Sequence, residues 1–286
     1  EEIEKIYSYK GFQSDIISDF DYSPDRKLLI GANLTKSSIW IWSTDSGALL
    51  KVLEASHSPV LATAFSPRNN LIASSSGNVA NPSGENVVHL WSNDTGKLLD
   101  VFKGHSAAVT DLVFSTNGYF LATASLDGTV RLWSVPQMSH CKNPPAIRPI
   151  NDFIFGNQWV NCVAFSPNSK TIASGYSNGD IKLTSVDPEE DDPPNLIPPR
   201  ELSVHCLKFS PDSKILAIGD SNNQITLWNM VTNTELMILN KHELTVSDLD
   251  FNYDGSLLVS SSWDGTCRLW EVDSGQEISI LSTREK

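Results

Sequence analysis

The stretch KGHSAAVTDLVFSTNGYFLATASLDGTVRLWS, residues 103–134, contains the pattern from which the rest of the chain can be interpreted. It holds three short apolar runs, which are separated by the dipeptides Asn117-Gly118 and Asp127-Gly128. Asn, Asp and Gly tolerate the backbone conformations of tight turns, so the runs on either side of them are expected to pair. The stretch therefore predicts three short strands joined by two tight turns.

Variants of this unit recur along the whole chain. The residues that end the first strand of each copy are Tyr22, Phe65, Phe114, Phe165, Phe209 and Phe251. The residues that end the third strand are Trp42, Trp91, Trp133, Thr184, Trp228 and Trp270. The spacing within the copies is 20, 26, 19, 19, 19 and 19 residues, and the underlying period is about 42. The chain is therefore built from six copies of one unit.

A fourth strand follows the third in each copy after a turn of its own. Asp45-Ser46-Gly47 precedes ALLKVL, and Asp273-Ser274-Gly275 precedes QEISIL. Four antiparallel strands in about 42 residues, without helical periodicity, are typical of a β-propeller blade. We therefore predict an all-β fold of four-stranded antiparallel blades.

The markers "GH…FS…LATASLDGTVRLW" resemble those of the WD-repeat β-propeller family, and the resemblance covers nearly the whole chain. The Trp-Asp pair that names the family is absent. The residues that follow the third-strand marker are Ser43, Ser92, Ser134, Ser185, Asn229 and Glu271.

The resemblance implies a structural tetrad in which a histidine bridges a turn carboxylate and a strand hydroxyl, and the hydroxyl meets an indole N–H. In the third copy the tetrad would be His105, Ser125 (or Thr123), Asp127 and Trp133. In the sixth copy it would be His242, Ser262 (or Ser260), Asp264 and Trp270. The fourth copy has Gly156, Tyr176, Asn178 and Thr184 at these places. We interpret the ring of Tyr176 as filling the space that Gly156 and Thr184 leave.

We expect a single propeller domain over residues 1–286. Its repeats are predicted at 13–54, 55–102, 103–154, 155–199, 200–240 and 241–281, and residues 1–12 are predicted to form an extra outer strand. Family propellers are usually closed by strands from both termini, which removes an exposed sheet edge. We therefore expect a seventh blade that this sequence holds only in part. The alternative is a six-bladed ring with a redundant strand.

The composition narrows the classes of partner. The chain has 21 basic and 34 acidic residues, a formal net charge of −13, which opposes binding to nucleic acid and to anionic membranes. The four cysteines are far apart, without the paired spacing of a zinc site, and indicate a reducing compartment. We expect no membrane insertion and a cytoplasmic location, with the nucleus as the alternative.

Two patterns suggest catalysis, and both are better explained by the repeat. The Ser, His and Asp of the third copy recur at repeat spacing with an indole partner, which favours packing over a catalytic triad. Residues 175–179, GYSNG, match G-x-S-x-G, but a strand follows them where a nucleophile elbow needs a helix. DPEEDDPP lacks the ligand spacing of a calcium loop. We expect no catalytic residue, no cofactor and no metal.

Exposed loops offer positions where a large apolar side chain has no packing role. In the family these are the loops between copies and the turn after the second strand, which together face the partner. The candidate contact residues there are Trp159, Trp263, Leu126 and Ile16. Either tryptophan could instead pack on a neighbouring loop.

The sequence favours a non-catalytic scaffold that binds other proteins or peptides on the propeller face, for example as the propeller domain of a larger signalling or assembly protein. The alternatives are a nucleic-acid-associated or chromatin module and a propeller enzyme. The net charge opposes the first alternative, and the few histidines give no converging set for the second.

Overall fold

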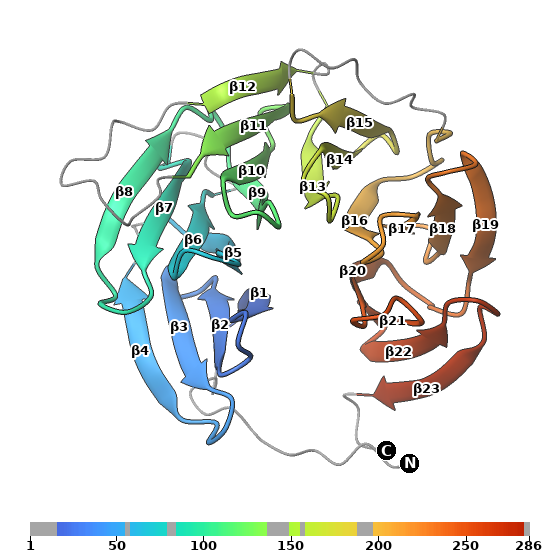
Figure 1. The fold of residues 1–286 in the computed structure, drawn as a ribbon, viewed down its shortest axis with the longest axis horizontal. Coiled ribbons are helices and arrows are strands. Elements are labelled where there is room, and N and C mark those ends of the chain that lie inside the picture. Colours follow the sequence, from blue (N-terminus) through green and yellow to red (C-terminus); the bar gives the residue numbers. More distant parts are fainter. Residues whose placement is uncertain are drawn as a thin grey trace. The chain divides into compact units, whose positions relative to one another are not determined.

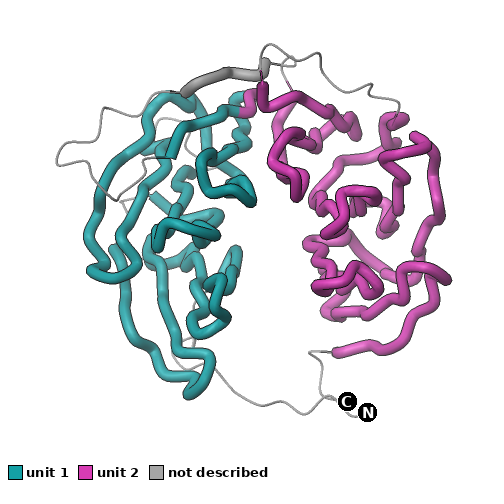
Figure 2. Tube along the Cα trace, viewed as in Figure 1, with its two compact units in different colours: residues 1–127, 131–152 teal, residues 128–130, 153–286 magenta. Residues whose placement is uncertain are grey.

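The computed structural model describes residues 16–54, 58–78, 84–135, 149–154, 158–187 and 197–282. The chain divides into two compact units, which Figure 2 distinguishes by colour. Unit 1 comprises residues 1–127 and 131–152, and unit 2 comprises residues 128–130 and 153–286. The described residues contain strands and turns, and none of them forms a helix that could span a membrane.

Unit 1 contains three four-stranded sheets apart from a few residues of the third, and each sheet is made of consecutive strands (Figure 1). The first is β1 (Ile17–Tyr22), β2 (Leu28–Asn33), β3 (Ser38–Ser43) and β4 (Leu49–Glu54). The second is β5 (Val60–Phe65), β6 (Leu71–Ser76), β7 (Val87–Ser92) and β8 (Leu98–Lys103). The third is β9 (Val109–Phe114), β10 (Phe120–Ser125), β11 (Thr129–Ser134) and β12 (Pro149–Ile154).

Unit 2 continues the same pattern. Its first sheet is β13 (Val160–Phe165), β14 (Thr171–Tyr176) and β15 (Ile181–Ser185). The next is β16 (Val204–Phe209), β17 (Ile215–Asp220), β18 (Ile225–Asn229) and β19 (Thr234–Leu239). The last is β20 (Val246–Phe251), β21 (Leu257–Ser262), β22 (Thr266–Glu271) and β23 (Glu277–Ser282).

These sheets confirm the predicted all-β fold of antiparallel, propeller-type blades, six in number. We number the blades 1 to 6 in chain order. Blade 4 has three described strands, since residues 188–196 lie outside the described part of the chain. The predicted outer strand at residues 1–12 also lies outside it, and the seventh blade stays a prediction.

The hairpin between the first and second strands of each blade is set by local side-chain bonds. In blade 1, Ser23 Oγ donates to Asp25 Oδ1 at 2.7 Å and accepts the N–H of Leu28 at 2.9 Å. Blade 5 repeats both bonds, with Ser210 and Asp212. Side chains that bond their own turn make the Ser-Pro-Asp sequence a strong hairpin signal.

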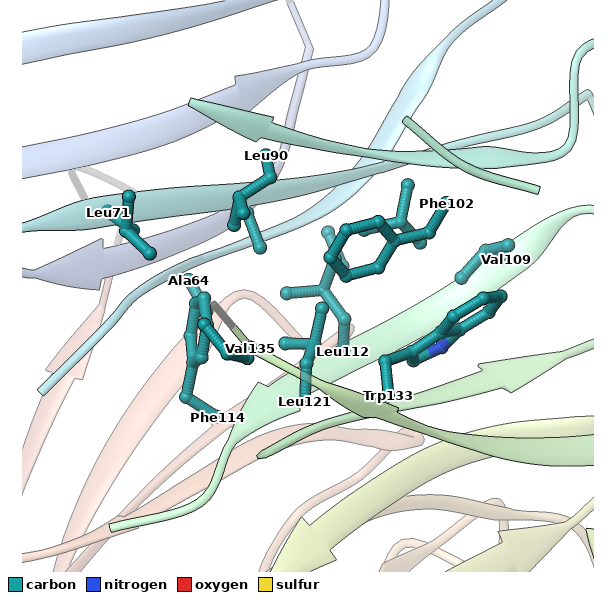
Figure 3. Packing of buried hydrophobic residues seen from close by; sticks show 13 residues of the cluster. Ala64, Leu71, Leu90, Phe102, Val109, Leu112, Phe114, Leu121, Trp133 and Val135 are labelled. Atoms are coloured by element: carbon teal, nitrogen blue, oxygen red, sulfur yellow. The ribbon is translucent and has the colours of Figure 1, made fainter. Parts of the chain in front are cut away.

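The apolar core lies between neighbouring sheets. In unit 1, side chains of blades 2 and 3 form one buried cluster, which Figure 3 shows. The rings of Phe102 on β8 and Trp133 on β11 are 5.2 Å apart, and Leu112 and Leu121 pack beside them. Each sheet therefore depends on its neighbour for burial, as expected of a fold made of repeated units.

Close packing of neighbouring blades in unit 2 leaves no room at Gly175 on β14. A Cβ there would lie 2.6 Å from Val204 Cγ1 on β16 and 2.7 Å from Cys162 Sγ on β13. Both contacts are shorter than van der Waals distances, so this glycine is required by the approach of the next blade.

We predict that Gly175→Ala lowers the free energy of unfolding by about 1–3 kcal/mol, because overpacking forces the two neighbours apart. Chemical denaturation measures the change. Cys162→Ala should recover part of the loss when it is combined with Gly175→Ala. Strict additivity of the two substitutions would contradict the assigned contact.

Candidate functional site

A buried polar network ties the turn of blade 3 to its strands. His105 Nδ1 lies 2.8 Å from Asp127 Oδ2, and Nε2 lies 2.8 Å from Thr123 Oγ1. Trp133 Nε1–H donates to the same hydroxyl oxygen at 2.9 Å. Since a carboxylate only accepts, Nδ1 carries a proton, and in the neutral imidazole Nε2 accepts from the hydroxyl. The histidine side chain is 1 % exposed, so the network is part of the core.

Blade 6 repeats this network bond for bond. His242 Nδ1 lies 2.8 Å from Asp264 Oδ2, and Nε2 lies 2.7 Å from Ser260 Oγ. Trp270 Nε1–H donates to Ser260 Oγ at 2.9 Å. The two blades therefore share one arrangement of histidine, carboxylate, hydroxyl and indole.

The hydroxyls of these networks are Thr123 and Ser260, so the assignment of Ser125 and Ser262 to the tetrads is corrected. Trp270 pairs with Leu258 across the sheet, and Ser260 is the diagonal neighbour on the same face. Diagonal side chains lie roughly 7–8 Å apart, within reach of an indole. Ser262 is two residues further along the strand, which places it roughly 7 Å beyond Ser260, too far from the Trp270 indole for a hydrogen bond.

The outer serines hold the loop that precedes each blade. Ser262 Oγ donates to the carbonyl oxygen of Leu244 at 2.9 Å and accepts the N–H of Asp264 at 3.1 Å. Ser125 makes the same two bonds, to Ala107 and from Asp127. In each of the two blades, the loop before the first strand is thus bonded by two hydroxyls of the second strand: one binds the histidine, and the other binds a loop carbonyl and the turn aspartate.

Asp264 also fixes the neighbouring loop directly. Its Oδ2 accepts the N–H of Glu243 at 3.0 Å, and its Oδ1 accepts the hydroxyl of Thr266 at 2.6 Å. Burial raises the pKa of Asp264, but the bonds from Thr266, Glu243 and His242 outweigh it and hold the pKa well below the ordinary aspartate value. The carboxylate is therefore a permanent acceptor at neutral pH.

We predict that Thr123→Val lowers the free energy of unfolding by about 1–3 kcal/mol, because two buried polar groups lose their partner. In a double-mutant cycle, Thr123→Val and Trp133→Phe should couple by about 0.5 kcal/mol or more. Ser125→Ala should be additive with Trp133→Phe. Coupling to Ser125 instead of Thr123 would overturn the assignment.

Blade 4 replaces this network with a tyrosine. Tyr176 is 1 % exposed and occupies the strand position of Ser125 and Ser262. Ser174 Oγ, at the position of Thr123, lies 3.3 Å from the Tyr176 hydroxyl. Burial raises the pKa of this phenol above its ordinary value. The ring is therefore a buried core group, whereas Gly156 lies outside the described residues.

Removing the ring should be costly because it is almost fully buried within blade 4. We predict that Tyr176→Ala lowers the free energy of unfolding by about 3–5 kcal/mol. Tyr176→Phe should cost about 1 kcal/mol, for the hydroxyl bond alone. Chemical denaturation of both variants tests this, and an unchanged stability of Tyr176→Ala would exclude a filling role.

The residue at the position of Thr123 and Ser260 differs among the remaining blades. Blade 2 keeps the bond, since Trp91 Nε1–H donates to Ser74 Oγ at 3.0 Å, whereas His57 lies outside the described residues. Blade 1 has Gly31 there, against which the Trp42 ring packs directly. Blade 5 has Ile218, and within the described residues the buried Trp228 N–H has no hydrogen-bond partner.

Neither catalytic pattern forms a reactive site. The hydroxyl that meets His105 is fully buried and already accepts the indole N–H of Trp133. Residues 175–179 comprise the end of β14 and the turn toward β15, in which the N–H of Gly179 donates to the Tyr176 carbonyl at 3.1 Å. The strand–turn–helix of a nucleophile elbow is not formed there. Within the described ranges, no three His, Cys, Asp or Glu side chains gather as a metal site.

The candidate contact residues differ in exposure. Trp159 is 54 % exposed and Trp263 is 65 % exposed, both in unit 2. Ile16 is 61 % exposed and Leu126 is partly buried, both in unit 1. The Trp263 ring lies edge-on to His205 at 5.7 Å, so it touches blade 5 and still presents most of its surface to solvent.

Each exposed tryptophan lies where the loop before its blade is bonded to the turn after the second strand. The Trp159 carbonyl accepts the N–H of Ser177 at 3.0 Å, and Trp263 N–H donates to the Thr245 carbonyl at 3.0 Å. Between them, Asn161 Nδ2 donates to Ser203 Oγ at 2.8 Å. The turn of blade 4 also bonds the loop before blade 5, since Arg200 N–H donates to the Gly179 carbonyl. The turn of blade 5 bonds the loop before blade 6, since Asn223 Nδ2 donates to the Glu243 carbonyl. The loops and turns of blades 4, 5 and 6 therefore adjoin one another, and we call their surface the unit 2 face.

Sequence reasoning missed two residues of this face. Leu202 is 47 % exposed and Leu244 is 50 % exposed. Each precedes a first strand by two positions, and each follows a glutamate, in Glu201-Leu202 and Glu243-Leu244. The Glu-Leu pair, repeated at the same position of two adjacent copies, is the sequence signal that could have identified these two residues.

Blades of this topology, held by histidine, carboxylate, hydroxyl and indole, define a WD-repeat β-propeller, and the predicted family resemblance is confirmed. The model of the WD domain, G-beta repeat, matches residues 47–92. The model of the IFT122 first β-propeller matches residues 78–285, and the chain belongs to this family. No curated protein matched the chain.

Proposed function

We propose that the chain is a non-catalytic interaction domain of a larger assembly protein and that the unit 2 face binds partner proteins. Propellers of the matched families are generally non-catalytic scaffolds, and WD40 propellers typically bind proteins. The observation that carries the proposal is the pair of largely exposed tryptophans, Trp159 and Trp263, on the unit 2 face. Exposed tryptophan is rare on a free surface and frequent in binding hot spots.

The buried polar networks support this function by fixing the face in advance. Asp264 and Ser262 hold the loop at residues 243–244 against the turn that carries Trp263. A surface that is ordered before binding loses less conformational entropy when the partner arrives.

The net charge of −13 supports a protein partner over nucleic acid. We propose a cytoplasmic location, and the match to the IFT122 propeller family favours a cilia-related site over the nucleus.

We predict that Trp159→Ala and Trp263→Ala each weaken partner binding by about tenfold or more, since truncation of a hot-spot tryptophan costs about 2 kcal/mol. Quantitative affinity purification compares partner recovery by the intact chain and by each variant.

Tyr253→Ala is the matched control, because Tyr253 is 95 % exposed on the first turn of blade 6, away from these loops. Unfolding curves of all three variants should overlay that of the intact chain. Equal recovery by the tryptophan variants and the control would contradict the proposal, as would loss of fold in both tryptophan variants.

A further inference from the structure

Two adjacent blades present the same exposed dipeptide on the unit 2 face. Glu201-Leu202 ends two residues before Val204, the first residue of β16. Glu243-Leu244 ends two residues before Val246, the first residue of β20. All four side chains are exposed, whereas both valines are fully buried. We call these four residues the Glu-Leu row.

The backbone of the first pair is held by blade 4. Arg200 N–H donates to the Gly179 carbonyl at 2.8 Å. Gly179 has φ +88°, and a Cβ there would overlap the carbonyl oxygen of Arg200. A glycine is thus required where the turn of blade 4 meets the residue before Glu201.

The backbone of the second pair is held from both sides. Asn223 Nδ2, on the turn of blade 5, donates to the Glu243 carbonyl at 2.9 Å. Asp264 accepts the Glu243 N–H at 3.0 Å, and Ser262 donates to the Leu244 carbonyl. Both pairs therefore keep a fixed position while their side chains face solvent.

The cations of the same loops are directed elsewhere. Arg200 lies 3.8 Å from Glu235 on β19, and Lys241 lies 3.8 Å from Glu277 on β23. Among the described residues, neither Glu201 nor Glu243 forms an ion pair. Two carboxylates therefore remain beside two exposed leucines.

We propose that the Glu-Leu row, flanked by Trp159 and Trp263, binds a peptide segment that carries aliphatic side chains and two lysine or arginine side chains. The leucines and indoles offer apolar area, and the carboxylates need a cation once a ligand excludes water from them. Facing sheets pack about 10 Å apart, so the two cations of the ligand should be separated by a similar distance. This inference rests on the proposed function of the unit 2 face.

The acidity of the row selects against other ligands with apolar groups. An anionic membrane surface would be repelled by Glu201 and Glu243, as would an acidic peptide. Charge complementarity therefore singles out a basic, partly aliphatic peptide.

The test is a titration of the intact chain with labelled synthetic peptides, followed by fluorescence polarisation. The peptides share length and leucine content and carry two lysines, two glutamines or two glutamates at the same places. We expect the dilysine peptide to bind at least tenfold more tightly than the diglutamine peptide, and the diglutamate peptide to bind weakest.

The doubly substituted chain with Glu201→Gln and Glu243→Gln should lose this preference and keep its unfolding curve. The matched control, with Glu271→Gln and Asp273→Asn, removes the same charge from the exposed end of β22 and the turn that follows it, and should keep the preference. Equal loss in both doubly substituted chains would overturn the proposal, because the effect would then follow net charge.

Three further outcomes separate this inference from the proposed function. In the first, the doubly substituted chain with Glu201→Gln and Glu243→Gln still prefers the dilysine peptide, while Trp159→Ala weakens the binding of all peptides. This result overturns the proposed ligand class but supports the unit 2 face as the binding surface. In the second, no peptide binds, but the intact chain still recovers partner proteins in a way that depends on Trp159. This result also overturns the ligand class and supports the binding surface. No peptide binding and no tryptophan-dependent recovery overturns both.

Discussion

The bond between a buried indole N–H and a strand hydroxyl is the interaction on which blades 2, 3 and 6 depend. It joins the third strand to the second in blades 2, 3 and 6, through Ser74, Thr123 and Ser260. A hydroxyl can accept from the indole and still bond a histidine, so one small side chain serves two neighbours. In blades 3 and 6 the histidine carries the connection on to the turn carboxylate. A single buried oxygen thus links the sheet interior to its exposed end.

Most of the fold could be predicted from the sequence, because each copy repeats both its turn chemistry and its aromatic markers. The choice between Thr123 and Ser125 was not settled, since both lie two residues apart on the same strand and share a face. The pairing register of the second and third strands determines which of these hydroxyls lies near the Trp133 indole, and the sequence alone does not give that register. The candidate tryptophans were found because the copies have smaller residues there, whereas Leu202 and Leu244 were missed because only position-by-position comparison of two copies reveals them.

Blade 5 shows how a repeat can exchange residues and keep an interaction. In blade 6 a strand cation, Arg268, pairs with Glu277 on β23. In blade 5 the equivalent strand position is Thr226, and Arg200 from the preceding loop lies near Glu235 instead. Glu235 and Glu277 occupy equivalent positions on the outer strands, but the cation comes from the third strand in blade 6 and from the preceding loop in blade 5. In both blades the outer strand is therefore paired with an arginine. Arg200 stands at the position that His105 and His242 have in their blades, so blade 5 lacks the tetrad histidine, and the Arg200 side chain is largely buried.

The distribution of tryptophan has a spectroscopic consequence. Of the eight tryptophans, Trp159 and Trp263 are largely exposed, and the others are buried within the sheets: Trp40, Trp42, Trp91, Trp133, Trp228 and Trp270. Indole emission shifts to longer wavelength in water, so the red edge of the spectrum reports the loops of unit 2 and the blue edge reports the sheet interiors. The intact protein carries two intrinsic optical signals, one for occupancy of a surface and one for the integrity of its blades.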